Sequence, residues 1–319
     1  MKREEVLKRL GYTVPDIKKK RVIISSDIAT EADDPFAIVH HLLTPSEDVV
    51  GIIAANFEWK YRTYPQLKEG AERSVEQSYQ MGKKILELME MDDIPLVRGA
   101  EDYIIDRAHL PESEGADFII REAMKESDEP LYIALQAHMT DLAIAYLKEP
   151  KIAEKITAAI WIGGAAYPEG GDEPNLREDV YAAQVVFNSA ITLWQIPANV
   201  YAKSYLSFAE LMTKIKPYGH IGQFLSDIML QVNDMYGNIP VRMPFPHGEV
   251  WSIGDQPTIT VLLQSETGSE FHTEYVKLQD DMTYELGMRG KAVRVYDAVD
   301  MRLTMEDLFS KLKLCYGEK

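Results

Sequence analysis

The sequence contains a single cysteine and no long apolar run. Cys315 cannot form a disulfide within the chain, so a reducing cytoplasm is the simplest compartment for the protein. No stretch approaches the roughly 20 apolar residues that a membrane-spanning helix needs. Residues 1–21 contain no apolar segment that resembles the core of a signal peptide. We therefore expect a cytoplasmic protein without a membrane partner.

Basic residues are also in short supply. The chain has 34 Lys and Arg residues against 51 Asp and Glu residues, which gives a formal net charge of -17 at pH 7. Proteins that bind nucleic acid or anionic membranes present a basic face, so the composition argues against both kinds of partner. Hydrophobic residues make up 46% of the 319 residues, which is enough for the substantial core of a soluble globular protein.

No internal repeat, low-complexity tract or linker divides the chain. We therefore expect one domain over residues 1–319, of which residues 1–20 form an N-terminal extension. The predicted strands are 22–25, 48–55, 94–97, 131–135, 156–162, 191–195 and 291–298. The predicted helices are 35–43, 79–89, 118–125, 140–147, 180–187, 208–215, 222–236, 257–263 and 305–312, the last of them capped by Thr304. Nearly continuously apolar strands that alternate with helices are typical of an α/β fold with a mostly parallel central sheet flanked by helices. Here the C-terminal half is predicted to be more helical.

An acidic turn follows the first predicted strand. Asp27, Glu31, Asp33 and Asp34 lie within a few residues of one another, directly before a predicted helix. Four carboxylates so close together cannot all be charged without a cation among them. Carboxylate oxygens are hard ligands, which favour Ca²⁺ or Mg²⁺ over zinc. Taken alone, Asp33 and Asp34 fit a simpler explanation, because carboxylates also stabilise the positive end of a helix dipole.

Ligands of parallel sheets bind beyond the carboxyl ends of the strands. The polar or glycine residues that follow predicted strands would therefore share one rim, and they are Asp27, Asn56, Gln136 to His138 and Gly163-Gly164. The glycine pair is a weak signal, since tight turns use it as often as ligand sites do. The acidic turn would lie on the same rim.

The order of these segments resembles the inosine-uridine-type nucleoside hydrolase family. The resemblance runs from about Val22 to the C-terminus. It rests on the acidic turn, on Asn56, and on the segments ALQAHMTDLAIAYLKEP, IWIGGAAYPEGGDEPNLREDVYAAQVVF and IGDQPTITVLL. It implies a calcium-dependent N-ribohydrolase that converts a small-molecule ribonucleoside to free base and ribose on the rim described above. It also implies a homo-oligomer, either a dimer or a tetramer.

The resemblance implies a role for each matching position. The implied metal ligands are Asp27, Asp34, Asp255 and the main-chain carbonyl of Gln136. Asp27 would in addition be the general base. The residues implied to contact ribose hydroxyls are Asp33, Asn56, Glu173 and Asn175. With the resemblance added, a metal site is favoured over helix capping for Asp33 and Asp34.

The chemistry of these residues is consistent with that activity. Ca²⁺ accepts 6–8 oxygen ligands at about 2.3–2.6 Å, so three carboxylates and one carbonyl leave room for a water molecule and two vicinal hydroxyls of a sugar. The ion would orient the ribose and acidify the water, whose proton Asp27 can take. Cleavage of the C–N bond would pass through an oxocarbenium-like state, whose positive charge an anionic pocket stabilises.

The chain departs from the family's usual pattern, Asp-x-Asp-Pro-Gly-x-Asp-Asp, in the acidic turn. Ser25 stands at the first aspartate, Ile28 and Ala29 stand near the Pro-Gly pair, and two extra residues precede Asp33. In this family a histidine often precedes the distal metal aspartate and assists the departing base, whereas this chain has Gly254 there.

Two residues of a Pro-rich loop are candidates for that missing function, His247 to protonate the base and Trp251 to stack on it. Trp251 is equally well explained as an anchor of its loop. Two alternatives follow from these departures. One is a hydrolase of another ribosyl or glycosyl compound on the same scaffold. The other is a non-catalytic protein that binds ribose or nucleosides, which is less favoured because binding alone does not need Asp27 as a base.

Overall fold

The computed structural model describes residues 1–68, 70, 72–237, 248–264 and 268–318. A nine-stranded sheet crosses the molecule in the order β10-β9-β11-β6-β5-β4-β1-β2-β3. The strands that run parallel are β1 (Lys20–Ser26), β2 (Glu47–Ala54), β3 (Leu96–Arg98), β4 (Leu131–Leu135), β5 (Ile156–Ile162), β6 (Leu193–Ile196) and β11 (Lys291–Ala298). At one edge, β9 (Glu270–Leu278) and β10 (Tyr284–Leu286) pair antiparallel.

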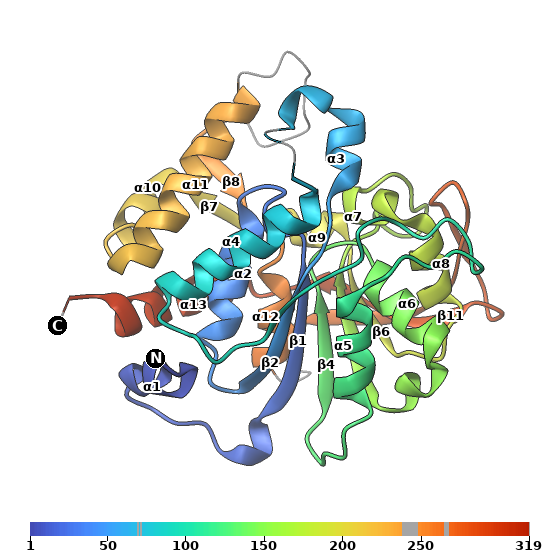
Figure 1. Ribbon diagram of the computed structural model, residues 1–319, viewed down its shortest axis with the longest axis horizontal. Coiled ribbons are helices and arrows are strands. Elements are labelled where there is room, and N and C mark those ends of the chain that lie inside the picture. Colours follow the sequence, from blue (N-terminus) through green and yellow to red (C-terminus); the bar gives the residue numbers. More distant parts are fainter. Residues whose placement is uncertain (69, 71, 238–247, 265–267, 319) are drawn as a thin grey trace.

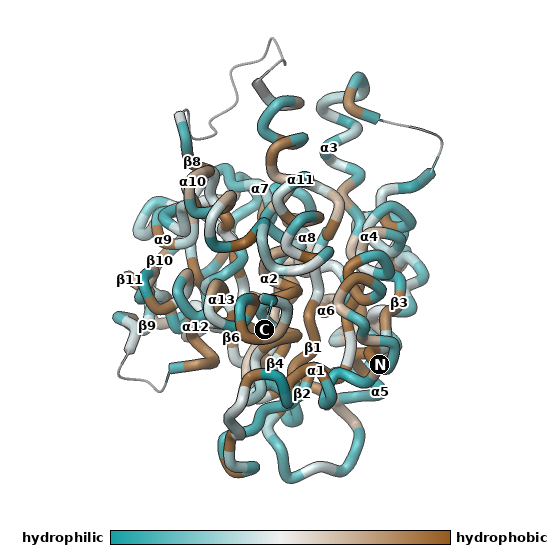
Figure 2. Tube along the Cα trace, turned by 90° about the vertical axis from the view of Figure 1, so that its left-hand side faces the viewer, coloured by the Kyte–Doolittle hydropathy of each residue, from teal (hydrophilic) through white to brown (hydrophobic). Residues whose placement is uncertain are grey.

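Helices cover both faces of this sheet (Figure 1). One core contains residues of α1 (Arg3–Leu7), α2 (Asp33–Leu42), α4 (Ser74–Leu88), α11 (Gly219–Gly237), α12 (Pro257–Leu263) and α13 (Met301–Tyr316). The other contains residues of α5 (Glu114–Ala123), α6 (Thr140–Lys148) and α8 (Val180–Phe187). Val22 and Ile24 of β1 belong to the first core and Ile23 to the second, because successive side chains of a strand point to opposite faces. Figure 2 shows the hydrophobic strands enclosed by helices with hydrophilic outer turns. The predicted α/β fold with a mostly parallel sheet is confirmed.

The path of the chain changes direction at β1. The first three strands extend the sheet to one side, and the chain then returns to place β4 on the other side of β1. In open parallel sheets such a reversal leaves a crevice at the carboxyl ends of the two strands. The elements that lie beyond these ends are α3 (Glu58–Thr63), α7 (Pro174–Glu178), α9 (Ala198–Tyr201) and the ribbon of β7 (Tyr205–Ser207) and β8 (Val250–Ser252) (Figure 1). The fold therefore predicts a ligand site at this end of the sheet.

The prediction of a more helical C-terminal half misses β9 and β10. Of the nine residues of β9 only Val276 and Leu278 are buried, so this strand, the second from the edge of the sheet, lacks the apolar run that identifies the inner strands. The last helix, α13, is capped by Asp300, whose side chain accepts a hydrogen bond from the Leu303 amide at 2.9 Å. The prediction that Thr304 caps this helix is wrong, because Thr304 is buried inside it.

Two other helices begin earlier than predicted because polar side chains hold their first turns. The first residue of α4, Ser74, donates its amide hydrogen to Glu58 Oε1 at 2.9 Å. In α5 the cap is Ser113, whose hydroxyl oxygen accepts from the Ala116 amide at 2.8 Å. Within the described ranges, no helix has the length and apolar character that crossing a membrane requires.

Candidate active site

Three aspartates from two distant segments converge beyond the carboxyl end of β1. Asp33 and Asp34 begin α2, and Asp255 lies just before α12. One carboxylate oxygen from each of the three lies within 4.8 Å of the other two. Asp34 and Asp255 are buried, at 2% and 3% exposed, while Asp33 is partly exposed. The group offers hard oxygen ligands to a single cation.

Hydroxyl side chains fix the turn between β1 and α2. Ser26, the last residue of β1, donates to Asp34 Oδ1. The Thr30 hydroxyl donates to Asp27 Oδ2, and the Thr30 amide donates to the Asp27 carbonyl at 2.7 Å. Asp27 is buried and lies beside Asp34, next to the group of three rather than within it. Asp33, predicted as a sugar contact, is a member of that group.

Burial and mutual repulsion shift the acidity of these side chains. Burial raises the pKa of Asp27 to about 6, against the opposing effect of its hydrogen bonds. Burial and the charge of Asp27 raise the pKa of Asp33 to about 7. The pKa values of Asp34 and Asp255 lie well above the usual range, first through burial and then through the neighbouring carboxylates. Because a bound cation would offset both effects, the residues present fit a divalent metal ion.

Gln136 ties the end of β4 to the segment that carries Asp255. Its amide donates to the Ser25 carbonyl at 2.8 Å, and its side-chain Nε2 donates to Thr258 Oγ1 at 3.0 Å. Thr258 in turn donates through Oγ1 to the Asp255 carbonyl at 2.8 Å. The carbonyl predicted as a metal ligand therefore belongs to a residue that is bonded to the same segment as Asp255.

The side chains predicted to contact ribose lie at strand ends and already have partners within the protein. Asn56 Nδ2 donates to the Ala100 carbonyl at 3.0 Å. Glu173, which caps α7, accepts from two backbone amides and from the Tyr201 hydroxyl, the last at 2.6 Å. Asn175 donates to the carbonyl of the last residue of β5 at 2.8 Å. A sugar hydroxyl would have to share or replace these bonds.

The structure describes only one of the two residues predicted to contact the base. His247 lies outside the described residues. Trp251 is in β8, is 3% exposed, and has its ring centroid 6.0 Å from that of Tyr236 in α11. Stacking on a base needs an exposed ring face, so the anchoring explanation fits the placement of Trp251 better.

Two buried charged residues of this rim were not predicted as site residues. Lys60 in α3 is 9% exposed, and its Nζ donates to the Thr30 carbonyl. Glu178 at the end of α7 is 9% exposed, and its Oε2 has no hydrogen-bond partner among the described residues. Both side chains act electrostatically on Asp27. Only their positions in the sequence could have indicated these two residues, because Lys60 follows the strand end at Asn56 and Glu178 follows Glu173.

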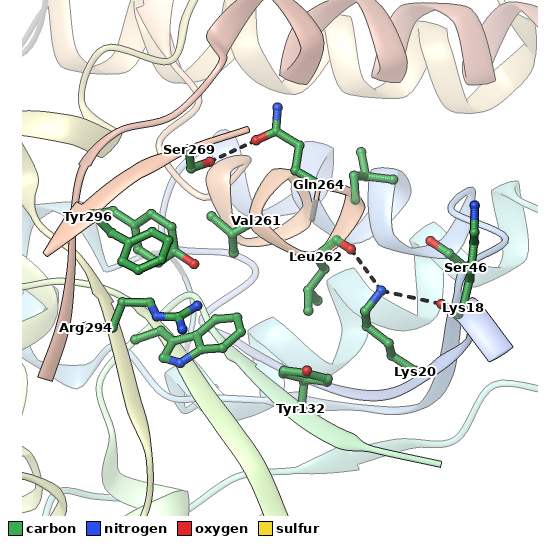
Figure 3. A pocket seen from close by; sticks show the side chains of 13 residues that line it. Lys18, Lys20, Ser46, Tyr132, Val261, Leu262, Gln264, Ser269, Arg294 and Tyr296 are labelled. Atoms are coloured by element: carbon green, nitrogen blue, oxygen red, sulfur yellow. Dashed lines mark hydrogen bonds between the residues drawn. The ribbon is translucent and has the colours of Figure 1, made fainter. Parts of the chain in front are cut away.

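A separate cavity of about 640 Å³ lies at the opposite end of the strands (Figure 3). Its walls include Lys20 at the start of β1, Tyr132 near the start of β4, and Arg294 of β11. Lys20 donates to the Leu262 carbonyl at 3.1 Å. No Asp or Glu is present among the described residues that line it. The acidic rim, and not this cavity, therefore has the groups that a cation and a general base require.

Residues 22–306 match the sequence profile of a family described as inosine-uridine preferring nucleoside hydrolase. The chain belongs to this family. The resemblance inferred from the sequence is thereby confirmed. The protein is a hydrolase that acts on N-glycosyl bonds, as are the nucleoside hydrolases to which it is similar in sequence and structure.

Individual relatives of this nucleoside hydrolase family member are distant. A probable uridine nucleosidase 2 of Oryza sativa subsp. japonica is 25% identical over 243 residues, which cover 69% of this chain and 68% of the relative. A pyrimidine-specific ribonucleoside hydrolase RihA of Klebsiella pneumoniae (strain 342) is 23% identical over 285 residues, which cover 80% and 84%.

Solved structures show the same fold. A plant nucleoside hydrolase, PpNRh1, matches with a TM-score of 0.69 at 19% identity, over 93% of this chain and 99% of that one. A purine-preferring ribonucleoside hydrolase from Gardnerella vaginalis matches with a TM-score of 0.70 at 16% identity, over 93% and 99% of the two chains.

Proposed function

We propose that this family member is a calcium-dependent hydrolase of ribonucleosides, which it converts to free base and ribose. The observation that carries the proposal is the convergence of Asp33, Asp34 and Asp255 beside a fourth buried carboxylate, Asp27. A purely structural cluster of this kind would be costly, because buried carboxylates without a cation repel one another.

The ion would be held by Asp33, Asp34 and Asp255, with Asp27 and the Gln136 carbonyl as candidates for further ligands. Calcium bound there would supply a positive charge that binds the vicinal hydroxyls of the sugar and lowers the pKa of a water molecule. We prefer calcium to magnesium because its flexible coordination by 6–8 oxygens accommodates a bulky diol, whereas magnesium keeps its own water molecules.

Asp27 would act as the general base. The Thr30 hydroxyl orients one of its oxygens, and burial holds its pKa at about 6. A base with a pKa near the working pH takes a proton readily and releases it again. Taking that proton also relieves repulsion with Asp33 and Asp34. The remaining carboxylates would stabilise the positive charge of an oxocarbenium-like state.

The ribose would be bound by the side chains at the same rim, namely Asn56, Glu173 and Asn175. The identity of the base is a separate matter, because the relatives are named for uridine, for pyrimidine nucleosides and for purine nucleosides. Because Gly254 stands where the family often has a histidine that assists the departing base, other ribosyl compounds should be tested as well.

The proposal is tested by product release from a panel of ribosides. Uridine, cytidine, inosine, adenosine and nicotinamide riboside are incubated with the protein, with calcium and with a chelator. We expect free base and ribose only with calcium. The Asp27→Asn variant should lose activity by about 10³-fold, within the range for general base catalysis. The matched control Asp128→Asn changes an exposed loop residue and should behave as the wild type.

Other outcomes separate the alternatives. Activity confined to compounds other than nucleosides would favour the alternative substrate class. Calorimetric binding of nucleosides without any product after long incubation would show that the nucleosides of the panel are not the substrates of this hydrolase. The homo-oligomer implied by the resemblance stays a prediction, which sedimentation velocity tests.

A further inference from the structure

Lys60 presents a buried ammonium group to the acidic rim. The residue lies in α3, which follows β2 and Asn56, and its side chain is 9% exposed. Its Nζ donates to the Thr30 carbonyl in the turn between β1 and α2. An ammonium group has three N–H donors. Among the described residues, Lys60 donates to no second acceptor and forms no ion pair with a carboxylate, so two of its three donors have no hydrogen-bond partner there.

The surroundings of Lys60 come from several elements. The carboxylates that act on it are, in order of strength, those of Glu31, Asp27, Asp34 and Glu178. Two aromatic rings flank the amine, that of Phe57 with its centroid 5.6 Å away and that of Tyr236 in α11 at 5.9 Å. Burial lowers the pKa of Lys60. The amine therefore lies within electrostatic reach of the proposed base, Asp27, and near the buried ring of Phe57 and the partly exposed ring of Tyr236.

A solely structural role is the simplest alternative for this lysine. A lysine that neutralised the acidic turn would be expected to form close ion pairs with it, because a buried charge is costly without them. Instead, the hydrogen bond of Lys60 goes to a neutral carbonyl, and its carboxylate neighbours act from a distance. The ammonium group of Lys60 can therefore donate further hydrogen bonds to a bound ligand.

The proposed reaction needs a group that protonates the departing base. The position that often holds the family's histidine is Gly254, and a Cβ atom there would lie 2.9 Å from Cδ2 of Tyr201 and 3.4 Å from Asp33 Oδ2. Tyr201 is itself fixed by its hydrogen bond to Glu173. A side chain at position 254 would therefore require the Tyr201 ring or the segment of Gly254 to shift.

We propose that Lys60 is the catalytic residue that protonates the departing base. This inference rests on the proposed function. When the C1′–N bond breaks, its electron pair stays on the base, and Lys60 Nζ transfers a proton to a nitrogen or carbonyl oxygen of that base. The oxygen of water forms the new bond to C1′, and Asp27 takes the proton that this water loses. Exchange of one proton from Asp27 to Lys60 through solvent restores both groups, so the net reaction consumes one water molecule.

The test compares two kinds of leaving group. Uridine and inosine release bases that need a proton, whereas 4-nitrophenyl β-D-riboside releases a stable phenolate that does not. In Lys60→Met the stem of the side chain is kept and the donors are lost. We expect kcat/KM for uridine and inosine to fall by about 100-fold or more, within the range for general acid catalysis. For the nitrophenyl riboside it should stay within about threefold of the wild type. The control is Lys83→Met, which changes an exposed lysine of α4 and should leave both activities unchanged.

A second variant guards against misfolding of the first. Lys60→Arg keeps the positive charge but holds its proton far more tightly, so it should show the same selective loss on nucleosides. Equal losses on both kinds of substrate would mean that Lys60 only maintains the structure, and wild-type nucleoside activity in either variant would also overturn the inference. A wild-type protein that cleaves none of these substrates would instead overturn the proposed function on which the inference rests.

Discussion

The amide nitrogen of Gly254 donates a hydrogen bond to Asp33 Oδ2 at 3.1 Å, between residues 221 positions apart in the sequence. This bond links the turn that carries Asp255 to the first turn of α2. It orients one of the three carboxylates that could share a cation. The site is therefore assembled by contacts between distant segments of the chain.

Gly254→Ala should weaken calcium binding. The added Cβ would lie 2.9 Å from the Tyr201 ring, closer than side-chain atoms normally approach, so either Tyr201 or the segment of Asp255 must move. We expect the dissociation constant for calcium to rise by about tenfold, which corresponds to about 1.4 kcal/mol. Isothermal titration calorimetry measures it. Unchanged affinity would show that the segment has room to adjust and that Gly254 is not required for the geometry.

Calcium should stabilise the fold more strongly as the pH rises. A carboxyl group whose pKa is raised by folding holds its proton more tightly in the folded state. The metal-free protein should therefore lose stability as the pH rises from the ordinary value of 3.8 through the folded values of about 6 for Asp27 and about 7 for Asp33. Calcium offsets this repulsion, and it adds about 2.7 kcal/mol at about 100 times its dissociation constant.

Thermal unfolding with calcium and with a chelator, at about pH 5 and about pH 7.5, measures the effect. The calcium-dependent rise in Tm should be larger at the higher pH. In Asp255→Asn, which removes one carboxylate, both the rise and its dependence on pH should shrink. An equal rise at the two pH values would contradict the electrostatic account of the site.

Arg3 should matter for stability but not for catalysis. Its buried guanidinium donates to the carbonyls of His41, Leu42 and Thr44, at the end of α2 that is remote from the acidic turn. Removing a charged donor that satisfies buried carbonyls costs about 2–3 kcal/mol. We expect Arg3→Met to lower the free energy of unfolding by this amount in denaturant titrations, with kcat/KM unchanged. The exposed neighbour provides the control, Lys2→Met. If Arg3→Met left stability unaltered, the hydrogen bonds of Arg3 to the end of α2 would not contribute to the stability of the fold.

The sequence locates Asp27, Asp33 and Asp34 because strong local patterns flank them. An apolar strand ends just before Asp27, and the apolar periodicity of a helix begins after Asp34. Nothing local connects Asp255 to them, since their proximity depends on the packing of α12 against α2, and only the family resemblance placed it in the site.

The parts that sequence reasoning missed depend on tertiary packing. Lys60 lies in a polar segment without clear periodicity, and its burial depends on α3, the acidic turn and α11 coming together. The ring of Trp251 belongs to the core because β8 pairs with β7, which a Pro-rich loop sequence does not reveal. Strands near the edge of the sheet, such as β9, are polar enough to resemble loops.

We propose that Asp34 and Asp255 hold one calcium ion beside Asp27, and a calcium titration of the metal-free protein measures this binding. Calorimetry should find one ion bound per chain. In the variants Asp34→Asn and Asp255→Asn the affinity should fall by roughly 100-fold, as for loss of a charged ligand, while Asp128→Asn should bind as the wild type does. Calcium binding that is absent from the wild type, or that survives unchanged in Asp255→Asn, would show that these aspartates do not form a calcium site.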